Sequence, residues 1–237
     1  MSSGTGQSYE RDPRWTAVDE YSFSHLHPST STPSPATLSH ALAHSAQSGL
    51  PDIAVSPSQG KFLALQARML RARNVLEVGT LGGYSTIWLA SAGPDVRVTS
   101  VEIDAHHAAV ARENLAHAGV DGRVDVRVGA GVDVLEQLSE EVRGGARERF
   151  QLVFIDADKE NNWRYVDLAV DMCEPGACVI VDNVVRKGQL ADPEADQRAQ
   201  GARRVVENVG KDGRLEGVVL QTVGEKNYDG FLMAVVK

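Results

Sequence analysis

The chain has 237 residues and a formal net charge of -8. This length is enough for one α/β domain with a sizeable core. The acidic balance, without any dense run of Lys and Arg, argues against a nucleic-acid partner. No apolar stretch approaches the roughly 20 residues that span a bilayer, so a membrane partner is not expected either.

The N-terminus is polar and has no apolar core of the kind that secretory signals carry. The two cysteines, Cys173 and Cys178, match no zinc-binding pattern. Free cysteines behave as small hydrophobic residues, and both fit core packing in a reducing compartment. We therefore expect a cytoplasmic protein.

Residues 1–35 differ in composition from the rest of the chain. Residues 28–35 form a Ser/Thr/Pro cluster, which is typical of a linker or an extended loop. Several apolar residues before this cluster favour a short helix that docks on the domain or on a partner subunit. These residues are Trp15, Val18, Tyr21, Phe23 and Leu26. We predict a partly flexible N-terminal arm over residues 1–35 and one domain over residues 36–237.

Helices are expected first at residues 37–48 and then from Ser56, a plausible N-cap that precedes Pro57. Strands and helices alternate from residue 74, which is typical of a parallel α/β sheet. The expected strands are at residues 74–78, 96–103, 123–128, 150–155 and 177–181. A helix at residues 196–209 and an antiparallel pair at residues 215–223 and 231–236 complete the pattern.

Polar side chains follow two of the most apolar predicted strands. Asp156, Asp158 and Lys159 come directly after one strand, and Asp182 and Asn183 follow the next. Ligands of open α/β sheets bind at the carboxyl ends of the strands, so these groups should face one crevice. Carboxylate and amide oxygens suit Mg²⁺, Mn²⁺ or Ca²⁺. Lys159 is an amine able to act as a base beside such a metal, or to form a surface salt bridge with a neighbouring acid.

A glycine-rich turn follows the first strand at Gly79, Gly82 and Gly83. A dinucleotide fold would show G-x-G-x-x-G, whereas this turn reads G-x-x-G-G after an acid, Glu77. Glu77 would attract an ammonium group, and Glu102 is placed to accept hydrogen bonds from ribose hydroxyls. S-adenosylmethionine therefore fits better than NAD, although the turn alone would also suit close strand–helix packing.

The sequence resembles the cation-dependent S-adenosylmethionine O-methyltransferases of the caffeoyl-CoA and catechol type, over nearly the whole chain. The resemblance is carried by the motifs at residues 55–60, 76–85, 101–104, 154–161 and 181–183. It implies a single Rossmann-like class I methyltransferase domain with helices on both faces of a seven-stranded, mostly parallel sheet whose last strand is antiparallel. It also implies a homodimer and the product S-adenosylhomocysteine.

The resemblance assigns roles to individual residues. It implies that Asp156, Asp182 and Asn183 hold the divalent cation, most simply Mg²⁺, and that Lys159 is the catalytic base beside Asp156. The implied contacts of S-adenosylmethionine are Val55, Glu77, Gly79, Ser85, Glu102, Gly131, Asp158 and Tyr165. The sequence departs from the family at Gly131, where alanine is usual, and at Arg186-Lys187, where an aromatic residue is common.

The implied reaction is methyl transfer to a hydroxyl of a phenolic, catechol-like small molecule, a vicinal diphenol. A cation chelating both oxygens would make the hydroxyl easier to deprotonate, and its charge would favour the neutral amine of Lys159. The alternatives are a methyltransferase for a non-catechol or nitrogen acceptor, a nicotinamide-dependent oxidoreductase, and a non-catalytic binding protein. The residues of the loop after Asn183 should shape the acceptor pocket.

Overall fold

The computed structural model describes residues 12–237, so residues 1–11 of the predicted N-terminal arm lie outside it. The rest of this arm contains the expected short helix, α1 (Pro13–Leu26), which Asp12 caps through its side chain. Phe23 of α1 packs edge-on against Trp88 at a ring distance of 6.3 Å. Val18, Tyr21 and Leu26 instead stay exposed, so residues 12–237 leave most of the apolar side chains that suggested docking uncovered.

A seven-stranded sheet forms the centre of the molecule, in the order β3-β2-β1-β4-β5-β7-β6. Six strands run in one direction and β7 runs against its neighbours β5 and β6, which confirms the predicted fold class. The strands are β1 (Asn74–Val78), β2 (Arg97–Glu102), β3 (Val124–Val128), β4 (Phe150–Ile155), β5 (Cys173–Val181), β6 (Leu215–Val223) and β7 (Tyr228–Val236).

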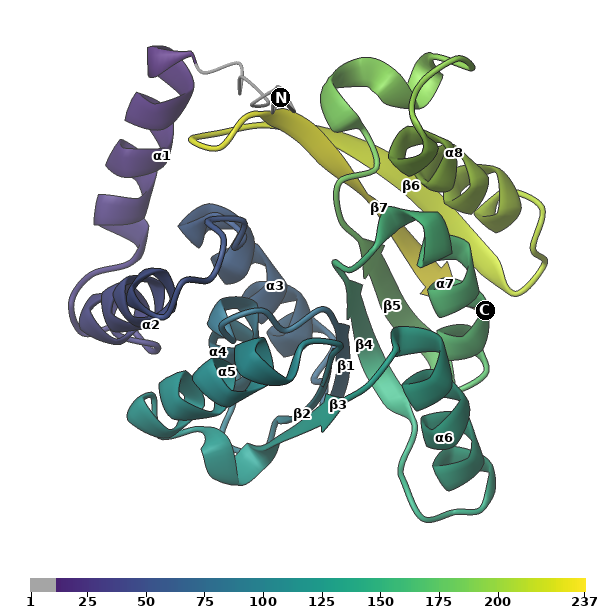
Figure 1. The fold of residues 1–237 in the computed structure, drawn as a ribbon, viewed down its shortest axis with the longest axis horizontal. Helices are drawn as coiled ribbons and strands as arrows, with labels where there is room; N and C mark the ends of the chain where they lie inside the picture. The colour runs from purple at the N-terminus through teal and green to yellow at the C-terminus, as the bar shows by residue number, and fades with distance from the viewer. Residues whose placement is uncertain (1–11) are drawn as a thin grey trace, which may run out of the picture.

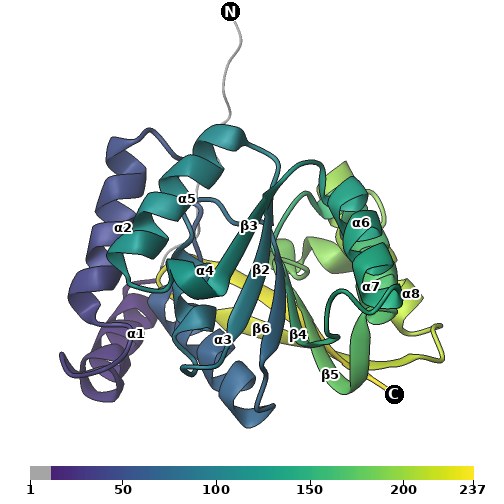
Figure 2. The ribbon, with the colours of Figure 1, turned by 90° about the horizontal axis from the view of Figure 1, so that it is seen from below.

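Helices cover both faces of the sheet, as Figures 1 and 2 show. One face packs against α2 (Pro35–Gln47), α3 (Pro57–Met69), α4 (Tyr84–Ala90) and α5 (Ala105–His117). The other face packs against α6 (Gly131–Arg143), α7 (Asn162–Val170) and α8 (Gln197–Val209). Short 3₁₀ turns lie at η1 (Asp121–Arg123), η2 (Lys159–Asn161) and η3 (Arg186–Ala191). Within residues 12–237, no helix is long and apolar enough to cross a membrane.

The central strands are buried on both faces, which explains their uninterrupted apolar sequences. Leu152, Val153, Phe154 and Ile155 of β4 are all fully buried. Burying such a side chain contributes roughly 1.5–3 kcal/mol to stability, which makes the position of β4 in the sheet hard to shift. The polar residues that follow β4 are therefore held at a fixed place on the edge.

Two strands are longer than their sequences suggested. β5 begins at Cys173, because its first residue pairs with Phe150 before a register shift, and β7 begins at Tyr228. The early start of β7 matters for function, because β7 is antiparallel. Its first residues lie at the same edge of the sheet as the carboxyl ends of β4 and β5.

Candidate active site

The register of β4 and β5 places the two predicted metal-binding aspartates side by side. Ile155 pairs with Val181, so the next residue of each strand, Asp156 and Asp182, emerges at the same level. Two backbone hydrogen bonds fix this edge, from Asp156 to Val78 at 2.8 Å and from Asp182 to Ile155 at 2.9 Å. The two carboxyl groups thus lie side by side, and each belongs to the first residue after its strand.

Asp182 is buried beside this second acid. Burial, together with the charge of Asp156, raises the pKa of Asp182 to about 7, against the opposing effect of Lys159. The ionised form of Asp182 is therefore costly unless a cation lies nearby. An environment that disfavours two adjacent negative charges fits a site that receives a positive one.

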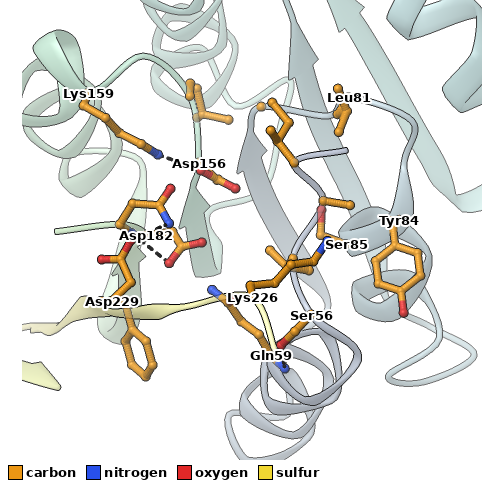
Figure 3. A pocket seen from close by; sticks show the side chains of 18 of the residues that line it. Ser56, Gln59, Leu81, Tyr84, Ser85, Asp156, Lys159, Asp182, Lys226 and Asp229 are labelled. Carbon is orange, nitrogen blue, oxygen red and sulfur yellow. Dashed lines mark hydrogen bonds and ion pairs between the residues drawn. The ribbon is translucent and has the colours of Figure 1, made fainter. Parts of the chain in front are cut away.

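Lys159 lies next to this acid pair. Its Nζ donates a hydrogen bond of 2.6 Å to Asp156 Oδ1, and its side chain is only 6% exposed. Lys159 therefore pairs with Asp156. It does not form the surface salt bridge with Asp158 or Glu160 that the sequence left open. Figure 3 shows the amine directed toward Asp156, with Asp182 close by. A buried amine at this place is positioned for proton transfer.

Helix α8 holds the turn that carries Lys159. A Cβ on Gly201 of α8 would come within 2.1 Å of the Lys159 carbonyl oxygen. The helix can therefore press against the backbone of η2 only because residue 201 has no side chain. This contact joins two segments that are far apart in the sequence. It fixes the backbone of Lys159, from which the side chain extends.

Asp229 is a residue of the site that the sequence patterns did not identify. It lies at the start of β7, and its Oδ2 accepts a hydrogen bond of 3.3 Å from Asn183 Nδ2. Its Oδ1 accepts hydrogen bonds from the backbone N–H groups of Arg186 and Gly230. Burial raises the pKa of Asp229. Asp229 reaches the edge that carries Asp156 and Asp182 only because β7 runs antiparallel to β5. Knowing that Asp229 lies at the start of this antiparallel strand would have been the one way to identify it from the sequence.

The orientation of Asn183 suits a role as a ligand. Its amide nitrogen is engaged by Asp229, which leaves Oδ1 as the atom that a cation would meet. No group of three or more His, Cys, Asp or Glu side chains within residues 12–237 is arranged to hold a metal. The donor set is instead two carboxylates and one amide oxygen, all hard ligands of the kind that Mg²⁺ and Ca²⁺ prefer. These residues fit the predicted divalent cation.

A cavity of about 1240 Å³ opens above this edge of the sheet. This volume exceeds the roughly 300–1,000 Å³ of a typical single-ligand pocket, so a cofactor and a second small molecule can lie in it together. In Figure 3, Asp156, Lys159 and Asp182 line one part of the cavity, and Tyr84 and Ser85 another. Except for Glu77, every predicted site residue lines it: Val55, Gly79, Ser85, Glu102, Gly131, Asp156, Asp158, Lys159, Tyr165, Asp182 and Asn183.

Glu102 organises the glycine-rich turn beside the cavity. Its Oε2 accepts hydrogen bonds from the backbone N–H groups of Thr80 and Leu81, at 3.2 and 2.7 Å. Gly79 adopts a φ of +102°, and a Cβ there would lie 2.1 Å from the Asp156 carbonyl oxygen. The glycine-rich turn therefore touches the end of β4 that carries Asp156, and only glycine permits this contact.

Glu77 lies behind the cavity wall. Its carboxyl group accepts hydrogen bonds from the hydroxyls of Ser85 at 2.6 Å, Ser100 at 2.5 Å and Thr86. Burial raises the pKa of Glu77 to about 7, although these three donors oppose the change. Because Ser85 stands between Glu77 and the cavity, a ligand amine would reach Glu77 through Ser85 or through water. Its predicted contact with the cofactor stays a prediction.

Asp158, Tyr165 and Gly131 form a second wall. The Tyr165 hydroxyl donates a hydrogen bond to Asp158 Oδ1, and Asn161 Nδ2 donates to Oδ2 at 2.5 Å. Burial and the hydrogen bond to Asp158 raise the pKa of Tyr165. A Cβ on Gly131 would come within 2.7 Å of the Tyr165 ring. The glycine at position 131 therefore makes room for this tyrosine in the position where it meets Asp158.

Comparison with known proteins identifies the family. Residues 28–234 match the family of O-methyltransferases. The chain belongs to this family. It is 52% identical over 234 residues to the O-methyltransferase imqG of Aspergillus flavus, which covers 98% of this chain and 94% of that protein. It is also 49% identical to the catechol O-methyltransferase of Mycobacterium tuberculosis, with 84% of this chain and 88% of that protein covered.

A solved structure agrees with this assignment. The structure of the O-methyltransferase from Bacillus cereus in complex with SAH superimposes with a TM-score of 0.89 and 45% identity. The match covers 95% of this chain and 99% of that one. The protein is therefore an S-adenosylmethionine-dependent O-methyltransferase. The oxidoreductase, the non-catalytic binding protein and the nitrogen methyltransferase considered from the sequence are set aside.

We expect Gly131→Ala to weaken the binding of S-adenosylmethionine by this O-methyltransferase about tenfold. The added methyl group would displace Tyr165 and break its hydrogen bond to Asp158, and a net loss of this kind costs about 1 kcal/mol or somewhat more. Titration calorimetry measures the change. Gly122→Ala is the matched control, because a Cβ at Gly122 meets nothing within 4 Å. Unchanged affinity in Gly131→Ala would show that the Tyr165 position is not needed.

Proposed function

We propose that this enzyme transfers the methyl group of S-adenosylmethionine to one hydroxyl of a vicinal diphenol, with the help of a divalent cation. Asp156, Asp182 and Asn183 would hold the cation, Mg²⁺ in the first instance and Mn²⁺ or Ca²⁺ as alternatives. Lys159 would be the general base. The acceptor would be a small phenolic molecule bound in the same cavity as the methyl donor.

One observation carries this proposal. The paired ends of β4 and β5 bring two carboxyl groups together beside a buried lysine amine, 2.6 Å from Asp156. Methyl transfer alone needs neither a pair of adjacent acids nor a buried amine. An acceptor that must lose a proton before it attacks the methyl group needs both functions, a positive charge near its oxygen and a base.

The residues of the chain divide the chemistry between them. When bound at this edge, a divalent cation would supply Lewis acidity that favours the ionised acceptor hydroxyl. Lys159 would take the hydroxyl proton on Nζ, and Asp156 would hold the amine in place through its existing hydrogen bond. Glu102 would fix the donor through the ribose hydroxyls and keep the glycine-rich turn close to the edge. Holding both reactants in one enclosed cavity lowers the entropic cost of the transfer.

The names of two relatives support the choice of acceptor. The proteins from Mycobacterium tuberculosis and Niastella koreensis, 49% and 44% identical, are both called catechol O-methyltransferase. A catechol presents two neighbouring oxygens, which a single cation can bind together. Vicinal diphenols are therefore the acceptors to test first.

We expect the purified enzyme with Mg²⁺ to methylate catechol at a much higher rate than phenol. Phenol offers one oxygen to the cation, so it lacks the second contact that fixes the nucleophile near the methyl group. Mass spectrometry of the product measures the transfer and its position. Mn²⁺ and Ca²⁺ are tested in parallel. Equal rates with phenol and catechol would contradict the diphenol as acceptor.

We also propose that the enzyme is a homodimer and that it works in the cytoplasm. The exposed apolar side chains of α1, Val18, Tyr21 and Leu26, support a contact of the N-terminal arm with a second copy. The two buried, free cysteines support a reducing compartment. Light scattering measures the mass in solution, and the mass of a single chain would contradict the dimer.

A further inference from the structure

Arg186 is a largely buried cation whose role in the reaction is not assigned by the features above. It follows β5 in the loop that covers the cavity, lines that cavity, and its side chain is only 10% exposed. Its Nε has no hydrogen-bond partner. Within the described part of the chain, its only ion pair is with Asp196, at the long distance of 4.0 Å.

The backbone of Arg186 is hydrogen-bonded to Asp229, which also contacts the predicted cation ligand Asn183. Its N–H donates a hydrogen bond of 2.7 Å to Asp229 Oδ1, and the other oxygen of Asp229 binds Asn183. Arg186 adopts a φ of +50°, a left-handed conformation that non-glycine residues rarely adopt. One carboxylate thus sets the position of both a predicted cation ligand and this arginine.

Arg186 lies on the acceptor side of the site. The predicted donor contacts Glu77, Gly79 and Glu102 come from β1 and β2, on one side of the edge that carries Asp156. Arg186 follows β5 and is held by β7, on the other side. A group that meets its guanidinium would therefore belong to the acceptor and not to the methyl donor.

The nearby acids make no hydrogen bond to the guanidinium. Asp196 caps α8 through its Oδ1, which accepts a hydrogen bond of 2.8 Å from Ala199, and its Oδ2 lies 4.0 Å from Arg186 Nη2. Asp229 accepts two backbone hydrogen bonds, one of them from Arg186 itself. A second arginine, Arg198 of α8, also lines the cavity. A planar guanidinium with unused N–H groups matches a carboxylate, which it can bind with two parallel hydrogen bonds.

We propose that the acceptor carries a carboxylate and that Arg186 binds it. The substrate class is then an acidic vicinal diphenol, with its hydroxyls at the cation edge and its carboxylate at the loop after β5. This inference rests on the proposed function and narrows it. In a chain with a net charge of -8, an anionic acceptor needs such a local positive group.

The test compares 3,4-dihydroxybenzoate with 3,4-dihydroxybenzamide, a neutral diphenol of the same shape, in the presence of Mg²⁺. We expect the native enzyme to prefer the acid in kcat/KM by about tenfold or more, the usual effect of a charge-assisted pair. Arg186→Gln should lose this preference and keep kcat/KM for the amide within about twofold. Arg186→Lys should keep part of it. Arg164→Gln, which alters an ion pair of α7 outside the cavity, should behave as the native enzyme.

The outcomes separate the two proposals. Equal use of acid and amide by the native enzyme overturns the inference and leaves the proposed function intact. The same is true if Arg186→Gln keeps the preference for the acid, or if it loses activity with the amide as well, which would mark Arg186 as a structural residue. Methylation of neither diphenol by the native enzyme overturns the proposed function together with the inference that rests on it.

Discussion

Removal of divalent cations should lower methyl transfer to catechol by roughly a hundredfold or more, since a cation acting as proposed would lower the barrier by several kcal/mol. The buried Asp182 beside Asp156 carries this expectation. An assay before and after treatment with EDTA, with Mg²⁺ then restored, measures it. Asp182→Asn should show the same loss without recovery. The matched control is Asp133→Asn, an exposed acid of α6 that does not line the cavity.

The raised pKa of Asp182 predicts how cation binding depends on pH. The folded-state pKa of about 7 exceeds the ordinary value of 3.8, so the protonated form stabilises the cation-free fold. That stabilisation is fully present below pH 3.8 and is lost as the pH rises through about 7. Protons therefore compete with the cation at low pH. Mg²⁺ should raise the melting temperature more at pH 8 than at pH 5.5. An equal rise at both, or activity that EDTA leaves unchanged, would refute the cation site.

Lys159→Met should lower kcat by about 10²- to 10⁴-fold, the usual contribution of a general base. The amine is buried and lies 2.6 Å from Asp156, so the substitution removes the group placed to accept the hydroxyl proton. Affinity for S-adenosylmethionine should change little. Steady-state kinetics with catechol and calorimetry with the methyl donor measure the two effects separately.

Lys159→Arg distinguishes a base from a mere positive charge. Arginine can keep an ion pair with Asp156, but it stays protonated and cannot accept a proton. We therefore expect this variant to be nearly as inactive as Lys159→Met. Lys211→Met, which removes an exposed lysine beyond α8, serves as the control. Near-native rates in Lys159→Arg would show that the lysine only balances charge.

The parts of the site that lie at strand ends could be predicted from sequence. A buried parallel strand is a continuous apolar run, and the polar residues that follow it, such as Asp156 and Asp182, must lie at the carboxyl edge. The antiparallel direction of the last strand was also predicted, from the residue pattern and from the family resemblance, whereas the strand order was not. The local capping signal at Ser56 was equally reliable, because Ser56 caps the helix that follows it.

The parts that depend on contacts between distant segments could not be predicted. Asp229 belongs to the site only because β7 runs antiparallel and starts earlier than its apolar run. The fit of Gly201 against Lys159 depends on how α8 packs on η2, and that of Gly131 against Tyr165 on how α6 packs on α7. No local pattern records such a distance, since any glycine in a helix looks the same in the sequence. The same holds for the Nε of Arg186, which has no hydrogen-bond partner among residues 12–237.

The hydrogen bonds of Glu102 affect how the cavity receives its two substrates. Its carboxyl group already holds the backbone of Thr80, Leu81 and Asp104, so the donor half of the cavity is preorganised before anything binds. The half in which we propose that the acceptor binds is lined by the loop after β5 and the turn between β6 and β7. Changes in these two segments can alter the accepted molecule while the methyl-donor half keeps its shape. New acceptor specificities can therefore arise on this scaffold without rebuilding the machinery that delivers the methyl group.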